Sequence, residues 1–129
     1  MSKYSYSKQI SIPFDEAVNK TITALKEEGF GILTDIDVKK ILKEKLDVDF
    51  KQYRILGACS PSRAYKALQA EEEIGLLLPC NIIVYEKSDG LVVISVIKPS
   101  VAFSIVGNKN LESLAQEVGE ILQSVIDYL

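Results

Sequence analysis

A turn signal, Ser88-Asp89-Gly90, joins two apolar segments of the chain, residues 80–86 and residues 91–98. An Asp-Gly pair between two strand-like segments is typical of a hairpin, in which neighbouring strands run antiparallel. This hairpin places a mostly antiparallel sheet at the centre of the expected fold.

Strand and helix periodicities alternate along the rest of the chain. Three further strands are predicted at residues 3–12, 32–36 and 53–60. Helices are predicted from residue 15 to residue 28, from residue 38 to residue 46, from residue 61 to about residue 74, and over residues 111–129. Residues 101–106 fit either another strand or a buried loop. The order β-α-β-α-β-α-β-β-α predicts the α+β class, as a two-layer sandwich with a mostly antiparallel sheet and helices on one face.

Length and composition favour one domain with its own core. The chain has 129 residues, of which 47% are hydrophobic and 26% are charged, close to the averages of globular domains. Its apolar segments are too short for a signal peptide or a membrane span. Two cysteines are also too few for the disulfide framework of a small secreted domain. We therefore expect a cytoplasmic protein without a membrane partner.

The charge balance argues against nucleic acid as a partner, because acidic residues outnumber basic ones by 18 to 15 and nucleic-acid affinity comes mainly from basic groups. The lysines of residues 39–45 alternate with acids and predict a solvated helix face. Glu71-Glu72-Glu73 is interpreted in the same way. The chain contains no histidine, which excludes Ser–His–Asp and Cys–His nucleophile pairs and an imidazole base within it.

Cys59 is the candidate for reactive chemistry. It precedes Ser60 and Pro61, a strong helix-start signal, and the free N–H groups at a helix start favour a thiolate. Ser60 adds a hydroxyl, and Cys80 begins a later strand. One hypothesis is therefore that Cys59 and Cys80 converge to form a redox pair or to bind a soft metal ion.

The alternative is that both cysteines are small buried hydrophobic residues. Their spacing matches no CxxC redox motif, and two thiols supply only half of a tetrahedral zinc site. Whether Cys59 and Cys80 lie close together depends on the direction of the strand that Cys80 begins. The sequence leaves both interpretations open.

The segments around the two cysteines, ILGACSP at residues 55–61 and GLLLPC at residues 75–80, resemble a known family. Together with residues 29–46 and Lys98-Pro99, they are similar to the family catalogued as domain of unknown function 302. Ser60 replaces the asparagine that is more usual there, and both residues are good N-caps. The resemblance implies an α+β two-layer fold similar to the TATA-binding-protein arrangement and a dimer, and it implies no activity.

The function that we predict is that of a non-catalytic binding or assembly domain that forms a homodimer. It depends on the complete core pattern, the missing catalytic residue types and the apolar hairpin strands, whose edges need protection. The alternative is a thiol-dependent redox or metal-handling protein that acts through Cys59 and Cys80. A small-molecule pocket between the last helix and the sheet is a third candidate, and no cofactor can be named.

Overall fold

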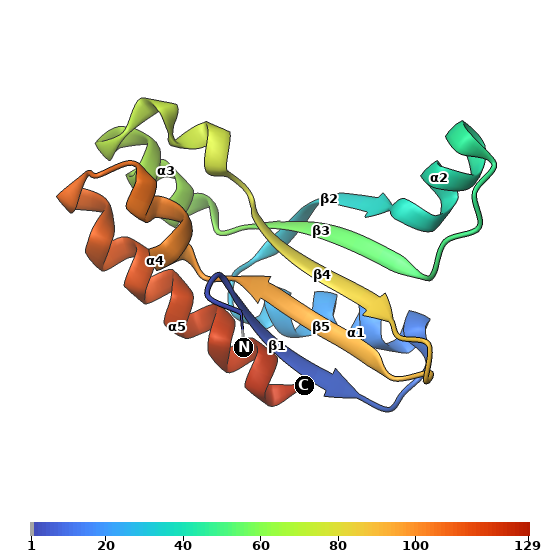
Figure 1. Cartoon of the computed structure of the whole chain (residues 1–129). Coiled ribbons are helices and arrows are strands. Elements are labelled where there is room, and N and C mark those ends of the chain that lie inside the picture. Colours follow the sequence, from blue (N-terminus) through green and yellow to red (C-terminus); the bar gives the residue numbers. More distant parts are fainter. Residues whose placement is uncertain (1) are drawn as a thin grey trace.

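The computed structural model describes residues 2–129, which fold as an α+β sandwich with a five-stranded sheet (Figure 1). The strands are β1 (Ser5–Ile10), β2 (Gly31–Asp37), β3 (Tyr53–Cys59), β4 (Cys80–Glu86) and β5 (Val92–Ile97). The α-helices are α1 (Phe14–Glu27), α2 (Val38–Leu46), α3 (Pro61–Ala70), α4 (Pro99–Ala102) and α5 (Glu112–Tyr128). Three short 3-10 helices are η1 (Glu72–Leu77), η2 (Phe103–Ile105) and η3 (Lys109–Leu111). The predicted fold class is confirmed.

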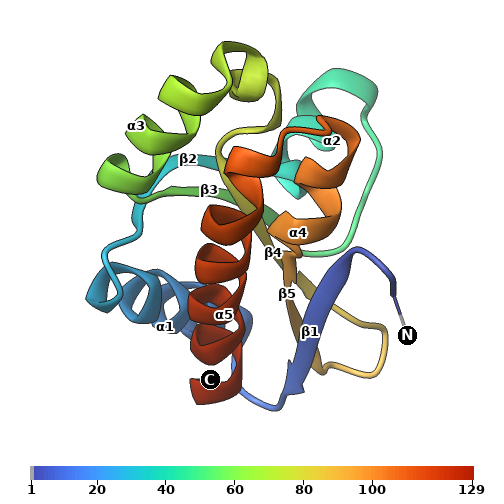
Figure 2. The same cartoon turned by 90° about the vertical axis from the view of Figure 1, so that its left-hand side faces the viewer.

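The strands lie in the order β1-β5-β4-β3-β2, and every neighbouring pair is antiparallel. The predicted hairpin forms between β4 and β5, where the Gly90 amide donates to the Lys87 carbonyl. β1 and β2 form the two edges, so the segment between them must cross the sheet. Helix α1 makes this crossing on one face (Figure 2).

The main core lies between the sheet and the two helices α1 and α5. Each strand sends alternate side chains toward these helices. The buried sheet residues of this core are Leu56, Ala58, Cys80, Ile82, Val84, Val92, Ile94 and Val96. Burying each larger aliphatic side chain contributes about 1.5–3 kcal/mol. Within residues 2–129, no helix is long and apolar enough to cross a membrane.

A second, smaller core fixes one end of the molecule. Its buried residues are Ala67, Ile74, Phe103, Leu111 and Ala115. They come from α3, η1, η2, η3 and the first turn of α5. This cluster joins the segment after β3 to the segment after β5, so both segments stand at the same end of the sheet (Figure 1).

Two predictions about local structure need correction. The third helix ends at Ala70 and not near Ile74, because Glu71 is extended and the Asn108 side chain donates to the Ala70 carbonyl at 2.9 Å. Residues 101–106 form neither a strand nor a loop. They continue the helical turns of α4 and η2, which begin at Pro99 and bury Phe103 in the second core.

Gly57 lets two segments approach the sheet closely. A Cβ atom on Gly57 would lie 2.2 Å from the Thr34 hydroxyl oxygen and 2.7 Å from Cγ of Pro79. Both distances are shorter than any ordinary contact. The glycine therefore allows β2 and the start of β4 to pack against the middle of β3.

Candidate functional site

The structure brings Cys59 and Cys80 together at one end of the sheet. Cys59 ends β3 and Cys80 begins the antiparallel neighbour β4, where it lies opposite Ala58. Both residues line a hollow of about 30 Å³, roughly the volume of one water molecule. The antiparallel arrangement, one of the two that the sequence left open, is the one that the chain adopts.

Cys80 lacks the properties of an activated thiol. Burial raises the pKa of the Cys80 thiol from its usual 9.0 to about 11, and the neighbouring Cys59 adds to the rise. A thiol with this pKa is neutral at pH 7, whereas nucleophilic attack and metal binding need the thiolate. Cys80 is only 8% exposed and belongs to the main core. These properties fit a small packing residue.

Ser60 contributes its hydroxyl to a different contact. Its side chain makes no capping bond to α3 and instead accepts a hydrogen bond from Nη1 of Arg63 at 3.1 Å. Arg63 also pairs with Glu117 on α5 through a 3.1 Å contact, and its guanidinium lies 5.9 Å from the centre of the Phe30 ring. Ser60 thus helps to fix Arg63 at the rim of the hollow.

The hollow between α3 and α5 is apolar. Besides the cysteines, it is lined by residues such as Phe30, Ala67 and Val118. In the described part of the chain, no three His, Cys, Asp or Glu residues gather where they could hold a metal ion. Cys59 and Cys80 are both free thiols. The site therefore offers a soft metal two sulfur atoms in apolar surroundings.

A second candidate site is the face of the sheet opposite α1 and α5, here called the open face. By strand alternation, it carries the side chains that do not enter the main core. Two rows cross it in register: Ile36, Ile55, Ile83, Ser95 and Ser7, and then Tyr53, Tyr85, Val93 and Gln9. The central strands thus present mainly apolar side chains on a face that no helix layer covers.

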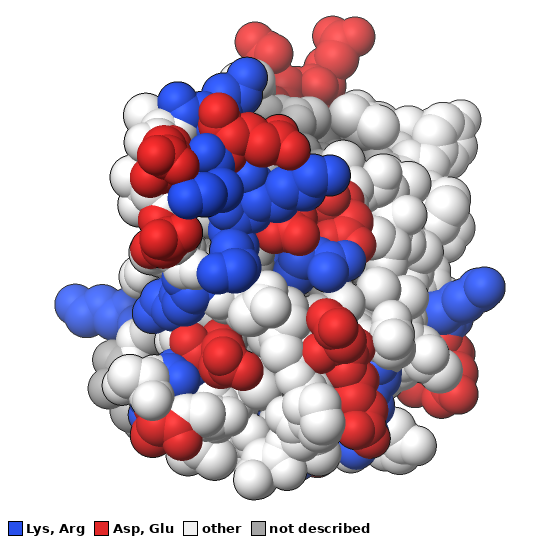
Figure 3. Space-filling model, turned by 90° about the vertical axis from the view of Figure 1, so that its right-hand side faces the viewer, with Lys and Arg blue, Asp and Glu red and all other residues white. Residues whose placement is uncertain are grey.

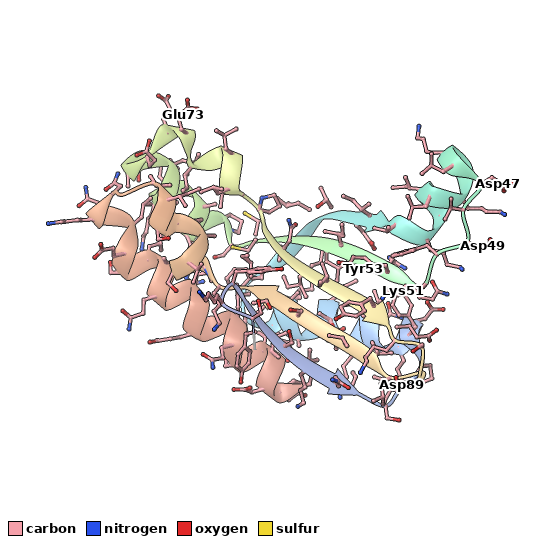
Figure 4. The ribbon with its side chains drawn as sticks, in the orientation of Figure 1. Asp47, Asp49, Lys51, Tyr53, Glu73 and Asp89 are labelled. Atoms are coloured by element: carbon pink, nitrogen blue, oxygen red, sulfur yellow. The ribbon has the colours of Figure 1, made fainter. Side chains whose placement is uncertain are left out.

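Aromatic side chains gather at one end of the open face. Tyr53 and Tyr85 stack with ring centres 5.4 Å apart, and Phe50 lies 6.1 Å from Tyr53. The ammonium of Lys51 lies over the Tyr85 ring, 5.0 Å from its centre, and Figure 4 shows Lys51 and Tyr53 at the same end of the sheet. Burial raises the pKa of the Tyr53 hydroxyl, with smaller contributions from Tyr85 and Tyr4. This aromatic cluster is suited to a contact that excludes water.

Helical segments stand at both ends of the open face. Helix α2 lies at one end, and η1 and α4 lie at the other (Figure 1). Figure 2 shows α2 and α4 on the side of the sheet away from α1. Between η1 and α4 is a crevice of about 270 Å³, whose lining includes Leu76, Asn81, Ile97 and Ala102. The open face is therefore flanked by a helical wall at each end.

Sequence reasoning did not identify the open face as a site. Tyr53 and Tyr85 carry no motif that marks them in the sequence, and in the fold each is only partly buried. The available signal was the continuous apolar runs of β4 and β5, which lack the polar alternation of a sheet with one solvated face.

Comparison with known proteins points to one family. The family model described as "Domain of unknown function DUF302" matches residues 6–129. The chain is also similar to a crystal structure of an uncharacterized conserved protein DUF302 from Bacillus stearothermophilus. The two are 28% identical, the match covers 98% of each chain, and the TM-score is 0.90. No curated protein matches the chain.

Proposed function

We propose that this chain, which belongs to the family described as Domain of unknown function DUF302, is an assembly domain that forms a homodimer through the open face of its sheet. The family description assigns no activity, so the proposal rests on the molecule itself. Cytoplasmic location remains a prediction from the number of cysteines.

The proposal rests on one observation. The central strands are apolar on both faces, but helices cover only one of those faces. Strands that are buried on both faces have nearly continuous apolar runs, whereas a half-solvated antiparallel strand alternates with polar residues. β4 contains Ile82-Ile83-Val84-Tyr85, and β5 is VVISVI. Helices α1 and α5 cover only one face of these strands. The chain itself covers this second face only in part: Val93 and Ser95 are buried there, whereas Ile55, Ile83 and Tyr85 are only partly buried. The central strands are thus suited to a second covering layer.

A second copy of the chain fits this face because an isologous contact joins the same patch on both subunits. Five strands spaced about 4.8 Å apart, each about 20 Å long, give a floor of roughly 400–500 Å². A standard interface buries about 800 Å² on each partner. The floor supplies about half of this area, and the walls at its two ends can supply the remainder.

The alternative function, thiol chemistry, has its two cysteines close together, but the buried state of Cys80 argues against it. The pKa of Cys80 rises to about 11 because the thiol is buried, which is opposite to the change that a reactive thiol requires. The prediction that the start of α3 activates Cys59 is tested by alkylating a Cys80→Ala variant across pH. Reaction near pH 6 no faster than that of a free thiol would reject it.

The homodimer is tested by sedimentation velocity over a range of protein concentrations. We expect the apparent mass of the wild-type protein to be twice the 14.3 kDa of one chain. Replacing Tyr85 with glutamate puts a charge inside the expected contact, within the aromatic cluster, and we expect it to give a monomer. The matched control is Tyr128→Glu, because Tyr128 is 70% exposed on α5 and lies outside the open face.

Circular dichroism shows whether each variant is folded. If Tyr85→Glu does not fold, Ile36→Glu replaces it, because Ile36 is already 39% exposed at the edge of the same face. A wild-type chain that remains monomeric at the highest concentration would overturn the proposal. A folded dimer of Tyr85→Glu or Ile36→Glu with unchanged affinity would show that the contact lies elsewhere.

A further inference from the structure

The two walls of the open face limit how two copies can pair, given the homodimer proposed above. A two-fold axis parallel to the strands places like ends together, so that α2 faces α2 and η1 faces η1. An axis across the strands places unlike ends together, so that α2 of each copy faces η1 and α4 of the other. The charges and apolar side chains at the two ends distinguish these arrangements.

Helix α2 and η1, taken by themselves, carry opposite charges. Helix α2, VKKILKEKL, has four lysines and one glutamate, whereas Glu71 and the first residues of η1 form a run of three glutamates. Acidic neighbours Asp47 and Asp49 pair with Lys43, and Figure 3 shows red and blue side chains together at this end. Lys40 and Lys45 form no ion pair with any residue of the described chain.

Glu72 and Glu73 likewise make no ion pair within residues 2–129. Figure 4 shows Glu73 far from Asp47 and Asp49, at the opposite end of the molecule. These glutamates and the unpaired lysines of α2 therefore do not neutralise each other within one chain. Pairing of like ends would bring glutamates against glutamates, which is unfavourable. Pairing of unlike ends brings glutamates against Lys40 and Lys45.

Helix α2 also needs a packing partner. None of the residues 38–46 that form it is buried, although a helix this short is marginal without tertiary packing. Its apolar side chains Ile41 and Leu46 are 40% and 66% exposed. At the other end, Leu76 is 82% exposed beside the crevice between η1 and α4. Each end thus has apolar surface next to its unpaired charges.

We propose that two copies pair with unlike ends together, so that α2 of each subunit packs against η1 and α4 of its partner. Lys40 and Lys45 then face Glu72 and Glu73 of the other copy, and Ile41 and Leu46 cover its crevice. Because the pairing is two-fold, the contact forms twice in each dimer.

Charge reversal tests the arrangement. One variant carries Glu72→Lys and Glu73→Lys, a second carries Lys40→Glu and Lys45→Glu, and a third carries all four changes. We expect each two-residue variant to dimerise at least about tenfold more weakly than the wild type, because like charges then meet at both contacts. The four-residue variant should regain wild-type affinity. The matched control is Glu27→Lys with Glu28→Lys, two exposed acids at the end of α1.

Sedimentation equilibrium gives the dimer affinity, and circular dichroism confirms folding of every variant. Raising the salt concentration should weaken the wild-type dimer, because screening reduces attraction between unlike ends. A dimer that strengthens with salt, or two-residue variants with unchanged affinity, would overturn the arrangement and leave the homodimer standing. Failure of the four-residue variant to recover would also overturn it. A wild-type monomer would overturn both proposals.

Discussion

Alkaline pH should reveal how deeply the Cys80 thiol is buried. A group whose pKa is higher in the folded state favours folding while it stays protonated, and this stability is lost as pH rises. For Cys80, the pKa rises from 9.0 to about 11, chiefly through burial. The stabilisation is complete below pH 9 and disappears as pH rises through 11.

The size of the effect follows from the two pKa values. Each tenfold change in acidity corresponds to about 1.4 kcal/mol, so the full preference for the neutral thiol is roughly 3 kcal/mol. At pH 10.5, most unfolded chains have lost this proton and most folded chains have kept it. About 2 kcal/mol of the free energy of unfolding should therefore be lost between pH 7.5 and pH 10.5 through Cys80 alone.

The assay is urea unfolding at both pH values in a Cys59→Ala background, where Cys80 is the remaining thiol. Replacing Cys80 with alanine gives the reference chain, in which tyrosines and lysines titrate as before. We expect the stability difference between the two chains to shrink by about 2 kcal/mol at pH 10.5. A difference that does not change with pH would refute the assigned burial of the thiol.

Three further changes test the packing of the sheet and its helices. Gly57→Ala should lower the free energy of unfolding by about 1–3 kcal/mol in urea melts, because the new Cβ meets the Thr34 hydroxyl; an unchanged stability would contradict the close approach. The hydrogen bond from Arg54 lowers the pKa of Asp35, so this pair stabilises the fold above about pH 4 and its contribution is lost on acidification. Asp35→Asn should therefore lose less unfolding free energy at acid pH than the wild type. Equal acid sensitivity of the two chains would count against this role of the pair. Asn108→Ala should lower the free energy of unfolding by about 1 kcal/mol, because the Asn108 side chain donates to the Ala70 carbonyl at the end of α3 and accepts from the Asn110 amide. A melting temperature equal to that of the wild type would argue against this role.

The sequence predicted most of the fold because its local signals agree with one another. The Asp89-Gly90 turn predicted the β4–β5 hairpin, and Asp37, which precedes the helix predicted from residue 38, caps α2 by accepting from the Lys40 amide. Prediction failed where a distant residue decides the outcome. Asn108 holds the end of α3 from 38 positions away, and no local pattern at Ala70 indicates such a partner.

The candidate cysteine site was predictable only in part. The motifs indicated that Cys59 and Cys80 occupy ends of strands, and the strand direction that brings them together was one of two alternatives. The thiol chemistry depends on burial, and burial depends on how α3 and α5 close over the hollow. No local pattern around Cys80 indicates that its pKa rises.

Cys80 links the two sites physically. It lines the hollow between α3 and α5, and it also lines the crevice at the end of the open face. A partner seated in that crevice would enclose the residue from its second side. A side chain at such a junction must be small and uncharged, and a neutral thiol meets both requirements. Packing within the core and at the proposed interface then accounts for a cysteine at position 80, because a residue that contacts both layers must fit both in size and charge.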